Sequence, residues 1–224
     1  LLGSGFAASF RAPGLEQISY LEYFYPGILL MLTLFASIFS TITIIEDRQQ
    51  GLLQEILVAP VPRLCIVVGK VLGAMSVALV QTLLLLLVAP LLGLSPPVFQ
   101  LLLIIAGLVV TALGFTALGF LIAWNMESSA GYHAIMSVFL MPLWMLSGAL
   151  FPVDQAPAWL WWLMILNPVT HALMLIRMPF YHTDSLWLLF QDWHYLLAVG
   201  ITLIWAVGCL VLALWRISRV EQGV

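Results

Sequence analysis

The chain has 224 residues, of which 63% are apolar and only 8% charged, and its mean hydropathy is +1.13. Soluble domains carry about 25% charged residues, so lipid must cover most of this surface, which excludes a soluble enzyme. The formal net charge of −3 excludes nucleic acid as a main partner, because no excess of Lys and Arg is available for phosphates. Cys65 and Cys209 lie in unrelated contexts and predict neither a disulfide framework nor a zinc site.

The hydropathy predicts an all-α, polytopic membrane helical bundle. A bilayer core of about 30 Å needs roughly 20 apolar residues per helix, and five such windows lack Asp, Glu, Lys and Arg. Ser95, Pro96 and Pro97 separate the second window from the third, so we expect a tight helical hairpin in which the prolines stop one helix and start the next. The five predicted spans are residues 25–45, 71–94, 98–124, 132–150 and 193–215.

The basic residues predict the orientation of the bundle. If the spans alternate, five of the seven Lys and Arg residues fall on one side, and an excess of this kind marks the cytoplasmic side. The 46–70 connection and the C-terminus are therefore expected in the cytoplasm, and the 151–192 connection outside. The five basic residues are Arg48, Arg63, Lys70, Arg216 and Arg219.

The first residues predict a further span that lies largely before them. The chain opens with Leu-Leu-Gly-Ser-Gly-Phe, without an initiator methionine and without the basic and apolar regions of a cleavable signal peptide. We therefore expect residues 1–6 to be the exit of an earlier transmembrane helix. The whole protein is then expected to have six spans, with both termini in the cytoplasm.

The 46–70 connection has an amphipathic pattern. Asp47, Gln50 and Gln54 fall on one helical face, and the opposite face is apolar. This pattern predicts a helix at the membrane surface that ends at Pro60 and Pro62. The apolar face consists of Leu52, Leu53, Ile56 and Leu57.

The 151–192 connection holds two apolar runs, 158–166 and 169–176, that are too short to cross a bilayer. Asn167 and Pro168 make a good helix start, with Asn at the N-cap and Pro at the first helical position. We therefore predict two short re-entrant or interfacial helices. Tryptophans are expected to form belts at both membrane interfaces, the outer one with Trp159, Trp161, Trp162, Trp187 and Trp193 and the inner one with Trp124 and Trp215.

The spans argue against ion-coupled transport and intramembrane catalysis. Transporters driven by protons or sodium place Asp, Glu, Lys or Arg inside their spans, and these spans lack them. Ser147 precedes Gly148 without a serine-hydrolase motif, the histidines form no HExxH motif, and the chain has no GxxxxGK[ST] phosphate-binding loop. We expect no catalytic residue and no metal site, and energy for transport that enters from outside the membrane region.

Two segments resemble type-2 ATP-binding-cassette (ABC) exporter permeases. In EDRQQGLLQEILVAPVPR, residues 46–63, a charged cluster is followed by Gly, a Leu-rich stretch with Glu, and prolines. In SGALFPVDQAPAWLWWLMILNPVTHALMLIR, residues 147–177, Gly, Phe-Pro, Asn-Pro and a terminal Arg follow in the family's order. The similarity runs from Tyr23 to the C-terminus and implies a single ABC type-2 transmembrane domain over residues 1–224.

The resemblance implies a dimer, with a second copy or a sister permease, and a cytoplasmic ATPase subunit for each protomer. It places ATP and Mg²⁺ in that partner and no cofactor in this chain. Residues 47–62 correspond to the coupling helix against the ATPase. The coupling residues carried over by position are Glu46, Asp47, Arg48, Gln50, Gly51, Gln54, Glu55, Pro60 and Arg63.

The resemblance also implies that spans 25–45 and 132–150 line a translocation path, which the 151–192 segment caps on the outside. Hydroxyl, aromatic and thioether side chains in these spans suit an amphipathic substrate. The path residues are Thr33, Ser37, Phe39, Ser40, Thr41, Met141 and Met145, and the outer-gate residues are Phe151, Pro152, Asn167 and Pro168.

Several polar residues have a second interpretation that stays open. The hydroxyls of span 25–45 can instead bond between helices or to the carbonyl four residues before. Gly69 and Gly73 are expected to form a packing contact, and Gln81 to bond to another helix. Arg177 is expected to pair with an acidic neighbour or with lipid headgroups, and Asp154 to cap a helix.

Together these features predict the permease subunit of an ABC exporter, integral to the plasma membrane, here the inner membrane of a bacterium. It would move an amphipathic or hydrophobic substrate outward, and we favour a small molecule over a lipid or a lipid-linked glycan. The alternative is an ATP-independent membrane scaffold or channel subunit. A neighbouring gene for an ATPase with a phosphate-binding loop would favour the exporter.

Overall fold

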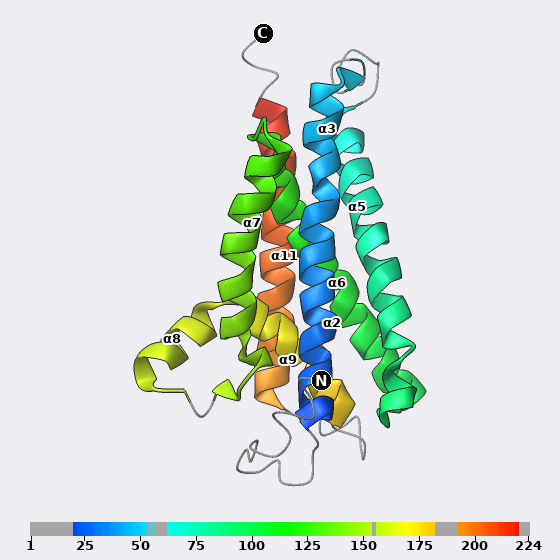
Figure 1. Cartoon of the computed structure of the whole chain (residues 1–224), viewed down its shortest axis with the longest axis vertical. Helices are drawn as coiled ribbons and strands as arrows, with labels where there is room; N and C mark the ends of the chain where they lie inside the picture. Colours follow the sequence, from blue (N-terminus) through cyan, green and yellow to red (C-terminus); the bar gives the residue numbers. More distant parts are fainter. Residues whose placement is uncertain (1–19, 53–54, 56–61, 154–155, 182–191, 220–224) are drawn as a thin grey trace.

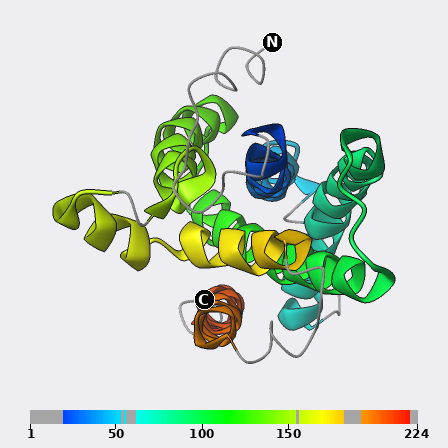
Figure 2. The same cartoon turned by 90° about the horizontal axis from the view of Figure 1, so that it is seen from below.

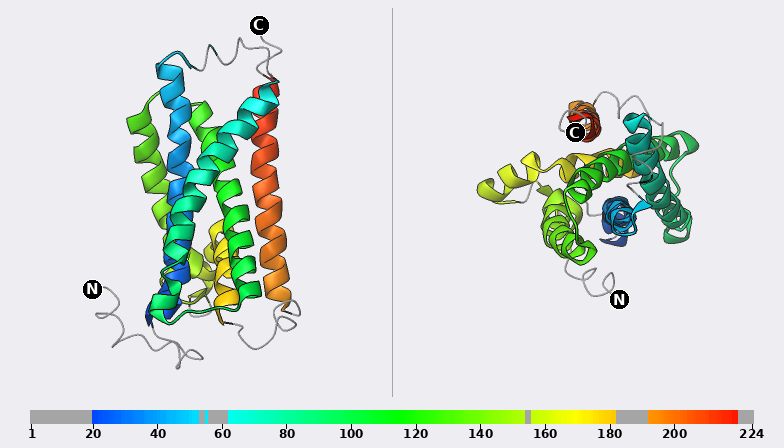
Figure 3. Two further views of the ribbon diagram at one scale, coloured as in Figure 1. Left: turned by 90° about the vertical axis from the view of Figure 1, so that its right-hand side faces the viewer. Right: turned by 90° about the horizontal axis from the view of Figure 1, so that it is seen from above.

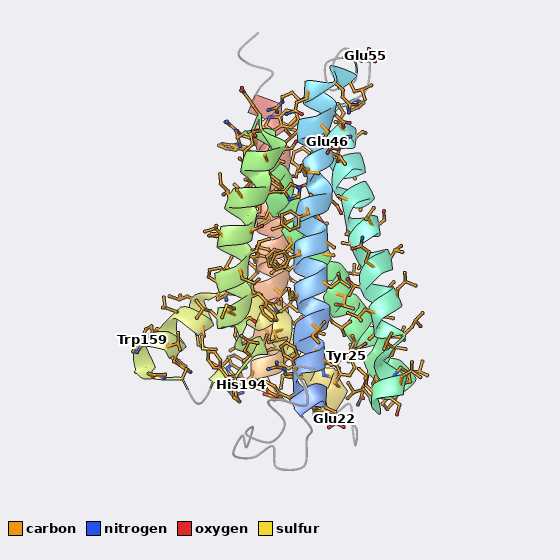
Figure 4. The ribbon with its side chains drawn as sticks, viewed as in Figure 1. Glu22, Tyr25, Glu46, Glu55, Trp159 and His194 are labelled. Carbon is orange, nitrogen blue, oxygen red and sulfur yellow. The ribbon has the colours of Figure 1, made fainter. Side chains whose placement is uncertain are left out.

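A computed structural model describes residues 20–52, 55, 62–153, 156–181 and 192–219, and every element in these residues is helical (Figure 1). The long helices run side by side between two ends. We call these the Glu46 end and the Glu22 end, after the residues labelled there in Figure 4. Residues 1–6, Gln54, Pro60, Asp154 and Trp187, on which some predictions rest, lie outside the described residues.

The helices agree with the prediction of a polytopic bundle. Within the described residues, five helices are long and apolar enough to cross a membrane, and a sixth candidate is a pair of short helices bent by 81°. The elements are α2 (Tyr20–Phe39), η1 (Ser40–Ile42), α3 (Thr43–Gln49), α5 (Arg63–Leu86), η2 (Ala89–Leu92), α6 (Val98–Trp124), α7 (Ser129–Trp144), the π-helical turn η3 (Met145–Ala149), α8 (Ala158–Leu166), α9 (Pro168–Tyr181) and α11 (Trp193–Arg219).

Helix α6 forms the centre of the bundle, in contact with α2, α5, α9 and α11. Its small residues let neighbouring helices approach closely, as is common in membrane bundles. Gly114 faces the ring of Trp205 on α11, and Gly119 faces Thr41 and Tyr132. Figure 3 shows α5 inclined across the bundle, and its far end meets α2 where the Tyr25 hydroxyl donates to the Leu85 carbonyl oxygen at 2.7 Å.

Replacing Gly114 by Ala is expected to lower the free energy of unfolding by about 1–3 kcal/mol, the usual cost of overpacking a core. The new Cβ would overlap the Trp205 ring and would lie 3.1 Å from the Cα of Ala206. Gly208→Ala on α11 is the matched control, because a Cβ there meets nothing within 4 Å. Thermal unfolding in one detergent compares the two variants, and equal midpoints would contradict this packing of α6 against α11.

The predicted boundaries are confirmed for α6 and α8 and differ elsewhere. Arg63 and Lys70 lie within α5 rather than in the connection before it, because the helix begins directly after Pro62, which stands at its N-cap. Helix α5 ends at Leu86, before the predicted limit of the span, and a short 3₁₀ turn follows it. Pro97 precedes α6 as expected.

Helix α7 does not continue regularly to residue 150. It passes into the π-helical turn η3, in which Gly148 has φ +85°. Glycine adopts this left-handed conformation without the steric cost of a Cβ, so the helix can break here. Hydropathy cannot show such a break, because the residues on both sides of it are apolar.

The predicted pair of short helices is confirmed as α8 and α9, which meet at Asn167. Viewed from the Glu22 end, α9 lies across the bundle with α11 on one side and α2 on the other (Figure 2). Most of α9 is buried, whereas α8 projects outward with Trp159 68% exposed. The tryptophans of α8 and Trp193 thus lie toward the Glu22 end, and those ending α6 and α11 lie toward the Glu46 end.

Candidate functional site

The charged cluster at the Glu46 end is a direct continuation of α2. Helix α2 runs through the 3₁₀ turn η1 into α3 without a loop, so a displacement of α3 acts on the whole span. The predicted single helix over residues 47–62 is wrong, however, because α3 ends at Gln49 and Gly51 has φ +81°. The Gly51 N–H donates to the Arg48 carbonyl, as expected for a helix that ends at a left-handed glycine.

An ion pair joins α3 to α5. The Lys70 ammonium contacts a carboxylate oxygen of Asp47, and both side chains are partly buried. Burial strengthens such a pair, because less water screens it. Asp47 was predicted to contact an ATPase, but in the protomer it links two helices.

Arg48 joins α3 to the end of α6. Its two terminal nitrogens donate to the carbonyls of Trp124, at 2.6 Å, and Met126, at 3.1 Å, and its guanidinium lies 5.6 Å from the Trp124 ring centroid. The last carbonyls of a helix lack partners within the helix, so a cation there is favourable. Arg48 therefore points into its own chain, and Arg216 on α11 donates to Asn125 in the same turn at 3.0 Å.

An exposed surface of three polar residues and one leucine remains beside these bonds. Glu46, Gln50, Leu52 and Glu55 are exposed, and Figure 4 shows Glu46 and Glu55 at the same end of the molecule. We call these four residues the coupling surface. The side chain of Arg63 lies outside the described side chains, so its predicted coupling role stays a prediction.

The three hydroxyls Thr33, Ser37 and Thr41 do not face a path in this protomer, because all three are buried. Thr33 bonds to Thr82 on α5 at 3.1 Å, and Thr41 to the Tyr132 hydroxyl on α7 at 2.8 Å. For these two threonines the structure shows the interhelical bonds that were the open alternative. The residue types alone could not distinguish a path residue from an interhelical bond, because a threonine hydroxyl suits both.

The other predicted path residues lie nearer the surface. Met141 on α7 and Met145, the first residue of η3, are each 44% exposed. Phe39 and Ser40 are partly exposed, and the Phe39 ring lies 4.7 Å from that of His133, which brings α2 and α7 together. These four residues remain candidates for a path, and the residues around them on α7 include the exposed Val138 and Phe139.

Helix α5 contradicts two packing predictions. A Cβ on Gly69 or Gly73 would meet no described atom within 4 Å, so these glycines form no packing contact among the described residues. They line a groove of about 660 Å³ with Ser40 and Lys70. Gln81 is exposed rather than bonded inside the bundle.

Two of the four predicted gate residues, Asn167 and Pro168, lie at the bend between α8 and α9. Asn167 is buried, and its amide nitrogen donates to the Leu143 carbonyl at 2.6 Å while its amide oxygen accepts from Val169 N at 3.0 Å. Pro168 begins α9 as predicted. Phe151 and Pro152 follow the π-helical turn and are partly exposed.

Arg177 was the residue most clearly misjudged from the sequence. Among the described residues it pairs with no acidic side chain, and its hydrogen bonds go to Tyr23 and to the Gly148 carbonyl. Its predicted binding to lipid headgroups stays a prediction. No sequence signal could have found these partners, because they lie 154 and 29 residues away. The described residues hold no group of three or more His, Cys, Asp or Glu side chains that could bind a metal ion.

The chain is similar to known membrane permeases. It is 33% identical over 183 residues to a putative transport permease, ycf38, of Cyanophora paradoxa, covering 81% of this chain and 62% of that protein. It is 28% identical over 156 residues to the probable multidrug ABC transporter permease YbhR of Escherichia coli K12, covering 69% of this chain and 42% of that protein. Nodulation protein J of Rhizobium leguminosarum is 27% identical over 179 residues, covering 79% and 69%.

The chain thus spans less than two thirds of the length of the first two relatives. The pattern of a family described as "ABC-2 type transporter" matches residues 2–181, which include the helical spans from α2 to α9 and both sequence segments noted above. Together with the apolar helices, this match identifies an integral membrane protein. The chain belongs to the ABC-2 type transporter family.

Proposed function

We propose that the chain is the permease subunit of an ABC exporter that moves an amphipathic or hydrophobic substrate outward. A separate ATPase subunit, which would hold ATP and Mg²⁺, is proposed to bind the coupling surface. One observation carries this proposal: α3 is bonded to α5 and to the end of α6, while the coupling surface beside it stays exposed. The names of the similar permeases support it.

These bonds give the proposed mechanism its physical path. A partner that displaces the coupling surface moves α3 and, through the continuous helix, α2. The Asp47–Lys70 pair carries that displacement to α5, and Arg48 carries it to the end of α6. Since packed helices are poorly compressible, a shift at one end is transmitted along the bundle.

We further propose that the Glu46 end and the C-terminus face the cytoplasm of a bacterium and that the bundle crosses its inner membrane. The excess of basic residues at this end supports the orientation. A second copy or a sister permease would lie against the exposed apolar face of α7, with the path between the protomers. Met141, Met145 and Phe39 would line that path.

The proposed substrate is a small amphipathic molecule. Methionine side chains adapt to varied apolar shapes, which suits a substrate that must not be held tightly. YbhR is named a probable multidrug permease, which favours this class over a lipid or a lipid-linked glycan.

The coupling surface can be tested by charge reversal. In the full-length protein, Glu46→Lys combined with Glu55→Lys is expected to weaken binding of the copurifying ATPase about tenfold or more. Both carboxylates are exposed, and basic groups of the partner that pair with them would be repelled by the two lysines. The measurement is the ATPase activity that copurifies with the tagged permease. Glu127→Lys is the matched control, since Glu127 is exposed at the same end but lies outside the coupling surface.

An equal loss in the control would show that partner binding does not depend on the coupling surface. If no ATPase copurifies with the unaltered protein and its transport is indifferent to ATP, the ATP-independent scaffold or channel becomes the better description. Loss of ATPase in the double variant alone supports the exporter.

A further inference from the structure

A cluster at the Glu22 end joins three helices that are far apart in the sequence. Arg177 on α9 donates through Nη1 to the Tyr23 hydroxyl, at 3.1 Å, and to the Gly148 carbonyl, at 3.0 Å. The Tyr23 hydroxyl donates to the same carbonyl at 2.9 Å, and the guanidinium lies 4.2 Å from the centroid of the Tyr23 ring. We call Arg177, Tyr23 and Gly148 the Arg177 cluster.

The backbone explains why the Gly148 carbonyl needs these donors. A regular α-helix continued past Gly148 would pair its carbonyl with residue 152, which is proline and has no N–H. Gly148 is buried, and a buried carbonyl without a partner is costly. The π-helical turn thus creates an acceptor that only residues from other helices satisfy.

A second bond lies one helical turn further along α9. The Tyr181 hydroxyl donates to the Glu22 carbonyl at 2.9 Å, and residues 177 and 181 share a face of the helix. Helix α9 is therefore attached to the first turn of α2 at two successive levels. The Nε of Arg177 is buried and has no acceptor among the described residues.

We propose that the Arg177 cluster is a latch that holds α2, α9 and the end of α7 together and keeps the Glu22 end of the permease closed between transport cycles. The proposal rests on the proposed function, in which α2 and α7 line the path. Arg177 acts as a positioning residue, since it contacts helices rather than substrate. For the path between the protomers to widen at this end, η3 must move away from α2 and α9, and the bonds that meet at Gly148 must break first.

The test uses the full-length protein in nanodiscs, with Cys65 and Cys209 replaced and one reporter cysteine introduced. Ser147→Cys, 1% exposed and next to the latch, reports on the Glu22 end, and Thr116→Cys, fully buried in the middle of α6, reports on general loosening. A hydrophilic thiol reagent is added without ATP. Arg177→Met is expected to raise the labelling rate of the first reporter about tenfold and to leave the second unchanged.

Tyr23→Phe provides a milder variant that removes one hydroxyl and keeps the ring under the guanidinium. It is expected to raise labelling of the Ser147→Cys reporter by about threefold. If Arg177→Met does not fold, this variant still tests the latch. Unchanged labelling in both variants overturns the latch, and so does an equal rise at both reporters, which indicates only a structural role.

Two further results separate the latch from the proposed function. With the ATPase subunit bound, Mg-ATP is expected to raise labelling of Ser147→Cys in the otherwise unaltered protein. If the variants open the Glu22 end but no ATPase binds, the exporter proposal fails and the latch stands. If ATPase binding and export are normal while the variants change nothing at the reporter, the latch fails alone.

Discussion

Replacing Arg48 by Met is expected to lower export at least about tenfold while the ATPase still binds. The variant removes two hydrogen bonds from a charged donor, worth about 1.5–3 kcal/mol each, and leaves the carbonyls of Trp124 and Met126 without this partner. Because the coupling surface itself is unchanged, partner binding should persist. Transport in proteoliposomes and copurified ATPase activity measure the two effects separately.

Arg48→Lys is the matched control for charge. A lysine keeps the positive charge but lacks the fork of donors that reaches two carbonyls at once, so an intermediate loss of export is expected. If Arg48→Met instead reduces ATPase binding as strongly as charge reversal at Glu46 and Glu55, Arg48 is a direct contact and its proposed role in transmitting displacement is wrong.

Several features of the fold could be predicted from the sequence. The exact limits of α6 and the start of α9 were predicted because each depends on local chemistry: a long apolar run, a proline before a helix, and an asparagine that caps one. The same holds for the class of the fold, since the near absence of charge leaves lipid as the surrounding medium.

The contacts at both ends could not be predicted in this way. Arg48 and Arg177 were read as surface cations, but each binds backbone carbonyls exposed where another helix ends or breaks. Those carbonyls become available only because of the backbone at the end of α6 and at Gly148, and hydropathy does not report backbone conformation. Likewise the sequence identified the hydroxyls of span 25–45 but not the neighbouring residues that they contact.

Asn167 is a residue for which local reasoning was correct but incomplete. Its role as the N-cap of α9 was predicted, whereas its bond to the Leu143 carbonyl on α7 depends on tertiary packing. Asn167→Ala removes both interactions and is expected to lower the free energy of unfolding by about 2–3 kcal/mol. For a chain of this size, thermal unfolding in detergent should then show a midpoint lower by about 5–10 °C.

Asn167→Ser separates the two interactions, because serine also caps helices but is too short to replace the amide donor to Leu143. It should recover about half of the stability lost in Asn167→Ala. Asn167→Asp keeps the cap as well but places a carboxylate oxygen against the Leu143 carbonyl, so it should be no more stable than Asn167→Ala. If Asn167→Asp matches the unaltered protein, capping alone accounts for the 81° bend, and the bond to α7 adds nothing to the position of α9.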